Sequence, residues 1–346
     1  MALSYRTRRF LNRLGIFLLA ALLLAIAAWI VWILWLDRFV VYSRDGAHFD
    51  FDRPSEMLSG EAAVPPQDQQ SVSIVYNDNA ANLNTSTELA PIRGYYADAK
   101  ALREDLSTVR ARIDSLPAGS AVMLDLKTIK GYFYYSSEVG PTSSSVDLEE
   151  IDKFITYLNN KDLYLIARIP AFRDYHYGLN YTSNGLFMKS NPIGLWMDRD
   201  GCYWLDPTKE GTLNYLTRIV AEIKRMGFDE VVFSDFCFPP TDDVQFSGDR
   251  HEALMDAANT LATICASETF CVSFCSETTN FELPAEERCR LYLVNFTAAQ
   301  VRTAAENTGL EDPEIRVVFI TEHGDTRFDE FSVMRPVSLI RYDDAQ

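Results

Sequence analysis

The stretch GFDEVVFSDFCFPP, residues 227–240, carries the pattern on which the fold prediction rests. It leaves an amphipathic segment at a glycine, crosses three apolar residues and reaches Ser234 and Asp235 shortly before two prolines. A short apolar run bounded by glycine and proline is typical of a buried β-strand. Such a strand has no structural need to end on a hydroxyl and a carboxylate, so its end is a candidate functional position.

The same pattern repeats from residue 91 onward. Apolar runs alternate with amphipathic segments such as 147–161, 212–226 and 251–267. Strands alternating with helices indicate a parallel sheet covered by helices, and runs that are apolar nearly throughout fit strands buried on both faces. The eight predicted strands are IRGYYA (92–97), AVMLDLK (121–127), LYLIARI (163–169), EVVFSD (230–235), FCVSFCSE (270–277), RLYLVNF (290–296), IRVVFITE (315–322) and VSLIRY (337–342).

Eight strands within residues 91–346 match the strand number and size of a (β/α)8 TIM barrel. A doubly wound open sheet is the alternative, but the chain lacks the glycine-rich phosphate turn that such a sheet carries after its first strand. We therefore predict an α/β barrel over residues 91–346.

Residues 16–36, IFLLAALLLAIAAWIVWILWL, contain no charge and are long enough to cross a hydrocarbon core of ~30 Å. Four arginines and no acidic residue precede them, so the positive-inside rule places a basic tail, residues 1–15, in the cytoplasm and the C-terminal domain outside the cell membrane. A cleaved signal peptide is the alternative, but Trp29, Trp32 and Trp35 stand where its cleavage site would lie. We predict an uncleaved, single-pass transmembrane anchor.

Residues 37–90 are predicted to form a juxtamembrane hairpin and a linker. VVYSRDGAHFDF (40–51) places two short apolar runs around Asp45-Gly46, which is a strong hairpin signal. EAAVPPQDQQ (61–70) has the composition of a linker.

Composition restricts the partners. The chain has 32 basic and 49 acidic residues and a net charge of −17, which disfavours nucleic acid and anionic polymers and favours a neutral ligand, although solubility explains the charge equally well. The four histidines are too few for a histidine-rich metal centre, and the six cysteines lack the paired spacing of a zinc site. We therefore expect no metal and no cofactor. Whether one disulfide forms, such as one joining Cys265 to Cys271 or Cys289, is a question that the sequence leaves open. The sequence also identifies no protein partner.

Barrel active sites lie at the C-terminal ends of the strands, so polar residues there form the candidate site. Glycoside hydrolysis needs a carboxylic acid and a second carboxylate, and aromatic faces stack on sugar rings. For any one of these residues the alternative is a structural role: the residue is polar because the barrel rim faces water, it forms a salt bridge, or it packs in the core of a loop. The predicted catalytic residues are Asp235 and Glu277, and the predicted substrate-binding residues are Asp125, Lys127, Arg168, Arg173, Asp174, Trp196, Trp204, Asp206 and Glu322.

Five segments between residues 92 and 240 resemble, in order, a family of glycoside hydrolase barrels of unknown function that is related to α-amylase-like and α-galactosidase-like (β/α)8 enzymes. The segments are IRGYYADAKAL, VMLDLKTIKGYFYYSSEV, DLYLIARIPAFRD, GLWMDRDGCYWLDP and GFDEVVFSDFCFP. The resemblance implies a barrel with a sugar site that includes Asp125, Lys127, Arg168, Arg173, Asp174, Trp196, Trp204 and Asp206.

The chain departs from this family at the expected catalytic positions. The aspartate that ends the family's fourth strand falls on Ser234, one place before Asp235, and its fifth-strand aspartate falls on Cys275, two places before Glu277. Side chains alternate along a strand, so Glu277 keeps the facing of the missing acid, whereas Asp235 replaces one only if a bulge or the strand end turns it. Where the family has an acidic pair, this chain has Thr128-Ile129.

Two functions follow. The first is a membrane-anchored glycoside hydrolase in which Asp235 is the nucleophile or base and Glu277 is a general acid whose pKa is raised by burial. The second is a barrel that has lost its chemistry and serves as a carbohydrate-binding or envelope scaffold protein. The geometry of the two carboxylates distinguishes them.

Overall fold

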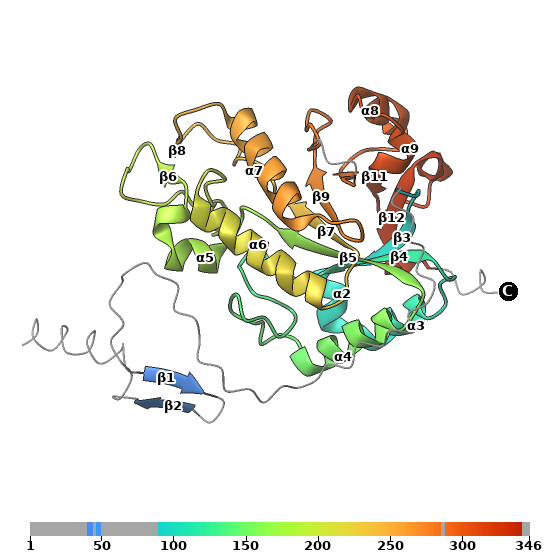
Figure 1. The fold of residues 1–346 in the computed structure, drawn as a ribbon, viewed down its shortest axis with the longest axis horizontal. Helices are drawn as coiled ribbons and strands as arrows, with labels where there is room; N and C mark the ends of the chain where they lie inside the picture. Colours follow the sequence, from blue (N-terminus) through green and yellow to red (C-terminus); the bar gives the residue numbers. More distant parts are fainter. Residues whose placement is uncertain (1–39, 44–45, 50–88, 285–287, 341–346) are drawn as a thin grey trace, which may run out of the picture. The chain divides into compact units, whose positions relative to one another are not determined.

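A computed structural model describes residues 40–43, 46–49, 89–284 and 288–340 (Figure 1). Strand β1 (Val40–Ser43) pairs antiparallel with β2 (Gly46–Phe49), which confirms the predicted hairpin. The predicted basic tail, the segment 16–36 and the linker lie outside the described residues. Within the part of the chain that the structure describes, no helix has both the length and the apolar character needed to cross a bilayer.

Residues 93–336 contain a closed barrel of eight parallel strands, which confirms the TIM barrel and excludes the open sheet (Figure 1). The order around the barrel is β10-β11-β12-β3-β4-β5-β7-β9, and β9 closes on β10. The strands are β3 (Arg93–Ala97), β4 (Ser120–Asp125), β5 (Leu163–Pro170), β7 (Glu230–Ser234), β9 (Cys271–Ser276), β10 (Leu291–Leu293), β11 (Val317–Ile320) and β12 (Ser332–Pro336).

The eighth predicted strand is wrong. Residues 337–342 were expected to form it, but β12 lies earlier and is followed by the 3₁₀ helix η3 (Val337–Leu339). Val337 and Ile340 are buried whereas Leu339 is 37% exposed, so the apolar spacing is that of a helical turn. The eighth strand has the sequence SVMRP, in which only two consecutive residues are apolar, so it lacks the apolar run by which the other strands were predicted.

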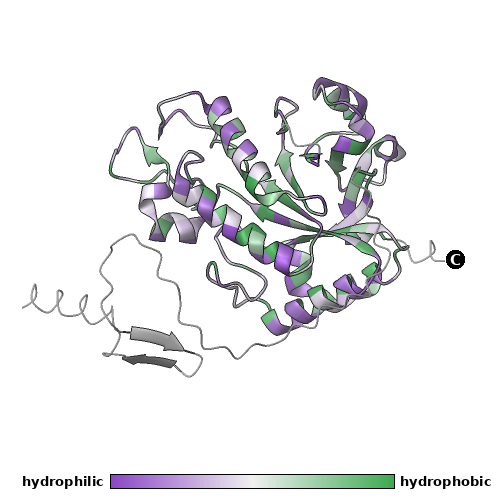
Figure 2. Ribbon diagram, in the orientation of Figure 1, coloured by the Kyte–Doolittle hydropathy of each residue, from purple (hydrophilic) through white to green (hydrophobic). Residues whose placement is uncertain are grey.

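Helices cover the outside of the barrel and present one apolar face to it. Purple and green residues alternate along α4, α6 and α7 in Figure 2, as expected for helices with one buried face. Aspartates cap several of them; Asp147, for example, accepts a hydrogen bond from the Glu150 N–H at the start of α4. The helices are α2 (Ala99–Glu104), α3 (Leu106–Ile113), α4 (Leu148–Asn159), α5 (Tyr175–Asn180), α6 (Glu210–Arg225), α7 (Arg250–Cys265), α8 (Val301–Asn307) and α9 (Pro313–Arg316).

Short elements decorate the loops at the C-terminal ends of the strands. Between β5 and α6 the chain makes a long excursion, in which β6 pairs antiparallel with β8 from the loop after β7. The described residues between β9 and β10 form no helix, so the helical layer is thinner beside α8. These remaining elements are η1 (Thr182–Asn184), β6 (Phe187–Met188), β8 (Val244–Gln245) and η2 (Thr326–Glu330).

Two apolar layers lie on the two faces of the strands. Ile166, Val232 and Met334 belong to the layer inside the barrel, while Leu165, Val231 and Phe233 face the helices. Because facing alternates along a strand, the inward set continues on β5 to Arg168. Asp125 is its direct neighbour in the register of β4 and β5, so both residues point toward the mouth of the barrel.

A buried ionic cluster, the base cluster, closes the N-terminal end of the barrel. Arg290 Nη1 lies 2.7 Å from Glu230 Oε2, and the exposed fractions of the two side chains are 3% and 0%. Tyr164 and Tyr292 donate their hydroxyl hydrogens to the two oxygens of Glu230 over 2.9 and 3.0 Å. Arg290 also donates to the carbonyl of Ala90 over 3.1 Å. Both oxygens of the buried carboxylate are therefore hydrogen-bonded.

Candidate active site

The mouth of the barrel contains a bidentate pair at the ends of β4 and β5. Arg168 donates from Nε to Asp125 Oδ1 over 2.6 Å and from Nη2 to Asp125 Oδ2 over 2.8 Å. Asp125 Oδ2 also accepts from the Ala99 N–H, and the guanidinium lies 5.5 Å from the centre of the Tyr96 ring. The side chains keep 16% and 19% exposure, so the two predicted residues form a pair that borders solvent.

Asp235 follows the last residue of β7 and has a left-handed backbone, with φ of 50°. This conformation is unusual for a residue other than glycine. Because the strand ends at Ser234, the turn re-aims the Asp235 carboxylate beside the mouth, where Ser234 Oγ donates to it over 3.3 Å. Arg173 Nη1 lies 3.7 Å from Asp235 Oδ1. The predicted condition, a strand end that turns this carboxylate, is therefore met.

Burial raises the pKa of Asp235 above its ordinary value, although the charge of Arg173, the hydrogen bond from Ser234 and the charges of Lys127 and Arg168 act in the opposite direction. The side chain is 25% exposed, so it borders solvent without being fully hydrated. A carboxyl of this kind holds a proton at higher pH than an ordinary aspartate does, which suits a proton donor.

Glu277 lies one residue beyond β9 and is exposed, so the burial expected for it is not present. Asn295, which has φ of 66°, donates from Nδ2 to Glu277 Oε1 over 3.1 Å. The pKa of the Cys275 thiol is raised to about 12; burial is the largest cause, Arg168 acts to lower the pKa, and the charges of Asp235 and Glu277 act to raise it. Both carboxylates therefore lie in the surroundings of Cys275, which occupies the position of the family's fifth-strand aspartate.

Arg173 joins Asp235 to the long loop between β5 and α6. Its Nε donates to Asp198 Oδ2 over 2.5 Å, and its Nη2 donates to Asp200. Trp204 donates its indole N–H to the same Asp198 oxygen over 3.1 Å. Burial acts to raise the pKa of Asp198, but the hydrogen bonds from the Cys202 N–H, Arg173 and Trp204 outweigh it and lower the pKa. Asp198 thus stays ionised and holds the guanidinium.

Lys127 and Asp174, both predicted to bind substrate, form a pair with no exposed side-chain surface. Lys127 Nζ lies 2.8 Å from Asp174 Oδ2 and donates to the Pro170 carbonyl over 3.1 Å. Tyr215 of α6 donates to the same Asp174 oxygen over 2.8 Å, and Asp174 caps α5. Because neither side chain reaches solvent, the expectation of direct substrate contact is corrected: this pair anchors the loop that carries Arg173.

The other predicted substrate-binding residues divide between the loop and the mouth. Asp206 is 8% exposed, and its Oδ1 accepts from the Thr208 N–H and hydroxyl. Trp196 packs edge-to-face on Trp204, with ring centres 6.2 Å apart. Through these contacts the two tryptophans and Asp206 stabilise the loop between β5 and α6. Glu322, by contrast, is exposed at the rim and lines two cavities.

Cavities follow the rim on the side of β9 to β12. One of about 390 Å³ lies over the ends of β3, β10 and β11, and Tyr96, Asn295, Phe296 and Glu322 are among its walls. A second, of about 360 Å³, shares Tyr96 and Glu322 with it and extends to Asp98 at the start of α2. The rim is therefore hollowed beside Glu322 and Asp98, whereas Asp125 and Asp235 are not among the residues that line these two cavities.

The described residues contain no group of three or more histidine, cysteine or acidic side chains arranged to hold a metal ion. Cys265 and Cys271 are buried free thiols, so they are not bridged to each other.

Sequence reasoning missed Asp198, Tyr96 and Phe296. Asp198 lies inside the quoted segment GLWMDRDGCYWLDP, two residues after Trp196, so the motif itself was the available signal. Tyr96 is the penultimate residue of the first strand of the barrel, and its inward facing follows from the alternation. Phe296 follows a short strand in the described chain, and nothing local distinguishes it from an ordinary apolar residue.

Solved structures share this fold. The α-galactosidase from Lactobacillus brevis matches with a TM-score of 0.52 and 11% identity over 75% of this chain and 39% of that chain. The PgaB (BpsB) glycoside hydrolase domain from Bordetella bronchiseptica matches with a TM-score of 0.50 and 12% identity over 67% of this chain and 84% of that chain. At these identities the likeness shows the fold alone. None of the curated proteins compared with the chain matches it.

A family model matches residues 97–269, half of the chain. That range contains the Asp125–Arg168 pair, the Arg173 loop and Asp235, and it ends before Glu277. The chain belongs to the family described as "Putative glycosyl hydrolase domain".

Proposed function

We propose that this protein is a glycoside hydrolase that residues 16–36 anchor in the cell membrane, with its barrel on the extracytoplasmic side and a neutral glycan as substrate. The observation that carries the proposal is the turn at Asp235, which brings a carboxylate of raised pKa to the mouth of the barrel, at the end of the strand that pairs with the one Glu277 follows. Membership of a glycosyl hydrolase family supports the same reaction class.

The burial of the two carboxylates favours an assignment of roles opposite to the one expected from the sequence. Asp235 is partly buried and its pKa is raised, so it is the general acid that protonates the leaving glycosidic oxygen. Glu277 is exposed and fixed by Asn295, so it is the base or nucleophile. Asp235 gives its proton to the leaving oxygen as the bond from that oxygen to the anomeric carbon breaks. A water molecule then adds its hydroxyl to the anomeric carbon and gives its proton to Glu277 as base or, if Glu277 is the nucleophile, to Asp235, and proton exchange with solvent restores both carboxyl groups.

The surrounding residues position the pair and the sugar. Arg173, held by Asp198 and Trp204, sets the direction of the Asp235 carboxylate. The Asp125–Arg168 pair and Glu322 border the open mouth, where they bind sugar hydroxyl groups. Lys127, Asp174, Trp196 and Asp206 act through the loop that carries Arg173.

A barrel that binds carbohydrate at the cell envelope without cleaving it is the second candidate. Two observations favour it: Glu277 lacks the burial expected of a catalytic acid, and Ser234 occupies the place of the family's strand-end aspartate.

Turnover distinguishes the two candidates. The full chain, purified in detergent, is applied to a glycan array and tested on chromogenic glycosides, together with Asp235→Asn and the matched control Asp256→Asn, which changes an exposed aspartate of α7. We expect Asp235→Asn to lose about 10²–10⁴-fold in turnover, because it cannot donate the proton, while the control keeps wild-type rates. Full turnover by Asp235→Asn contradicts the assignment. Glycan binding without turnover by the wild type supports the second candidate.

A further inference from the structure

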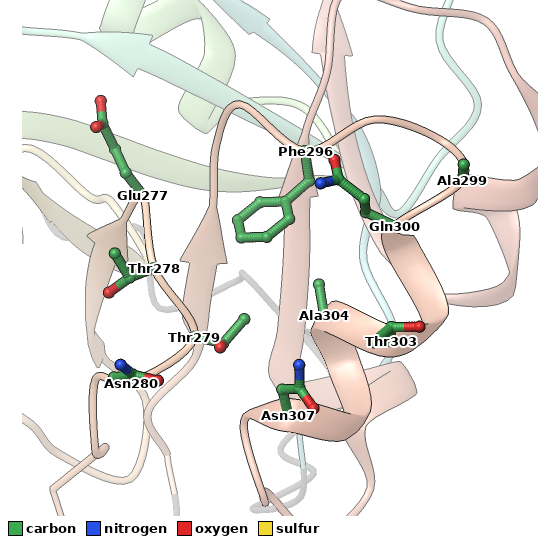
Figure 3. Close-up of a pocket in the computed structure, with 10 residues that line it drawn as sticks. All are labelled: Glu277, Thr278, Thr279, Asn280, Phe296, Ala299, Gln300, Thr303, Ala304 and Asn307. Carbon is green, nitrogen blue, oxygen red and sulfur yellow. The ribbon is translucent and has the colours of Figure 1, made fainter.

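A cavity of about 410 Å³ lies between the loop after β9 and helix α8, beside the mouth of the barrel (Figure 3). Thr279 and Asn280 stand on the loop side, and Phe296, Gln300 and Asn307 stand on the other side (Figure 3). The described residues that line this cavity include no basic side chain, and Glu277 at its edge is the one acidic residue among them. Amides and hydroxyls beside an aromatic ring suit a neutral, hydroxyl-rich ligand.

Phe296 connects this cavity with the one at the mouth, because the residue lines both. Its ring packs edge-to-face on Phe319, with centres 6.3 Å apart, so it is fixed from the core side. A fixed aromatic side chain offers contact area at low entropic cost. Gln300 is also held in place, since its side-chain oxygen accepts from the Thr297 N–H over 3.0 Å and from the Thr297 hydroxyl over 2.8 Å.

We infer that this cavity, the α8 subsite, binds a second sugar unit of an extended glycan whose reacting unit lies at the barrel mouth. Glu277 lines the α8 subsite and is hydrogen-bonded to Asn295, which lines the mouth cavity, so a chain crossing Phe296 passes the proposed reacting group. The inference rests on the proposed function, and it specifies an oligomeric or polymeric glycan in place of a single sugar.

Chain length is the variable that tests this inference. The full chain in detergent is titrated calorimetrically with neutral gluco-, galacto- and N-acetylglucosamine oligosaccharides of one to six units. We expect the dissociation constant to fall about tenfold or more between one unit and three units of the accepted series, because the longer ligand reaches both cavities.

Variants of the α8 subsite test whether it is the source of that gain. Thr303→Trp, which fills the cavity from an exposed position of α8, and Asn307→Ala should remove the gain of the longer ligands and leave binding of one unit unchanged. The matched control is Glu306→Trp, on the same helix and outside the lining, which should behave as the wild type.

The outcomes separate the two proposals. If one and six units bind equally well, or if Thr303→Trp and Glu306→Trp keep the same gain, the α8 subsite is refuted while the mouth stands as a sugar site. If the wild type binds no glycan of any length, both the subsite and the proposed function fail. Phe296→Ala adds a second readout; a loss of the length effect at an unchanged melting temperature supports the shared aromatic wall.

Discussion

The two ends of the barrel hold charged residues in opposite states. At the base, Glu230 and Arg290 are buried and paired, and Tyr164 and Tyr292 complete the hydrogen bonds of the carboxylate. At the mouth, Asp125 is 16% and Asp235 25% exposed. Charged groups that keep part of their surface in water are able to meet a ligand, whereas those in a buried cluster are not.

Backbone strain is also concentrated at the mouth. Among the described residues, three other than glycine have positive φ, and two of them, Asp235 and Asn295, follow strands of the barrel at this end. Holding a non-glycine residue in this region costs of order 1–3 kcal/mol, and such residues cluster at functional sites. The structure thus maintains a costly backbone conformation at Asp235, one of the two proposed catalytic carboxylates, and at Asn295, which holds the other.

The largest expected effect concerns the base cluster. Glu230→Gln leaves the Arg290 guanidinium buried without its counter-ion, and we expect it to lower the free energy of unfolding by about 3–5 kcal/mol. The double variant Glu230→Gln/Arg290→Met should lose less than the sum of the two single variants, since it removes both charges. Urea denaturation measures both.

The matched control for this experiment is an exposed pair on the surface. Glu330→Gln breaks the contact between Arg302 and Glu330, whose side chains are 70% and 51% exposed, and it should change stability little. An equal loss in Glu230→Gln and Glu330→Gln would contradict a structural role for the base cluster.

A smaller effect is expected from Asp229, which precedes the base cluster. Burial and, less strongly, the charge of Glu230 raise the pKa of Asp229 to about 6, although its side chain accepts from the Leu165 N–H over 2.7 Å. The folded state therefore favours the protonated acid. Its stabilisation is fully present below the unfolded pKa near 4 and is lost as the pH rises through about 6, with a total of at most about 3 kcal/mol.

Asp229→Asn tests this pH dependence. The variant should unfold with a weaker loss of stability between pH 4 and pH 8 than the wild type, as measured by urea denaturation at each pH. Parallel curves for the two proteins would show that Asp229 is not the titrating group.

The smallest effect is expected from Asp235→Gly at the mouth. Glycine adopts a φ of 50° without the steric cost that aspartate has there, so we expect a gain of about 1 kcal/mol in stability together with a loss of turnover. Asp256→Gly, inside α7, should instead lose about 0.3 kcal/mol, because glycine is a somewhat poorer helix former than aspartate. A loss of stability in Asp235→Gly would show that the mouth is not strained.

Much of the fold was predictable because it depends on patterns local to each segment. Seven strands follow from apolar runs, and closure into a barrel follows from their number and their alternation with helices. The eighth strand was missed because Val333 and Met334 are its only aliphatic residues, whereas Val337 to Ile340 offered a longer apolar run that forms a helical turn.

The candidate site was predictable in its residues and less so in its geometry. Their positions at the C-terminal ends of predicted strands placed Asp125 and Arg168 at the mouth, and both are there. The left-handed backbone of Asp235 depends on the end of β7 and on Arg173, which is distant in the sequence. The exposure of Glu277 depends on a connection without a helix in its described part, and the burial of Lys127 depends on Tyr215 of α6. These are tertiary effects that a single segment does not encode.

One measurement tests the contrast between mouth and base most directly: turnover and melting temperature, determined on the same preparations of the wild type, Asp235→Asn and Glu230→Gln. The account predicts that Asp235→Asn melts with the wild type and has lost turnover, while Glu230→Gln melts at a lower temperature and keeps the turnover of its folded fraction. An Asp235→Asn protein with wild-type turnover, or a Glu230→Gln protein that melts normally and has lost turnover, would contradict it.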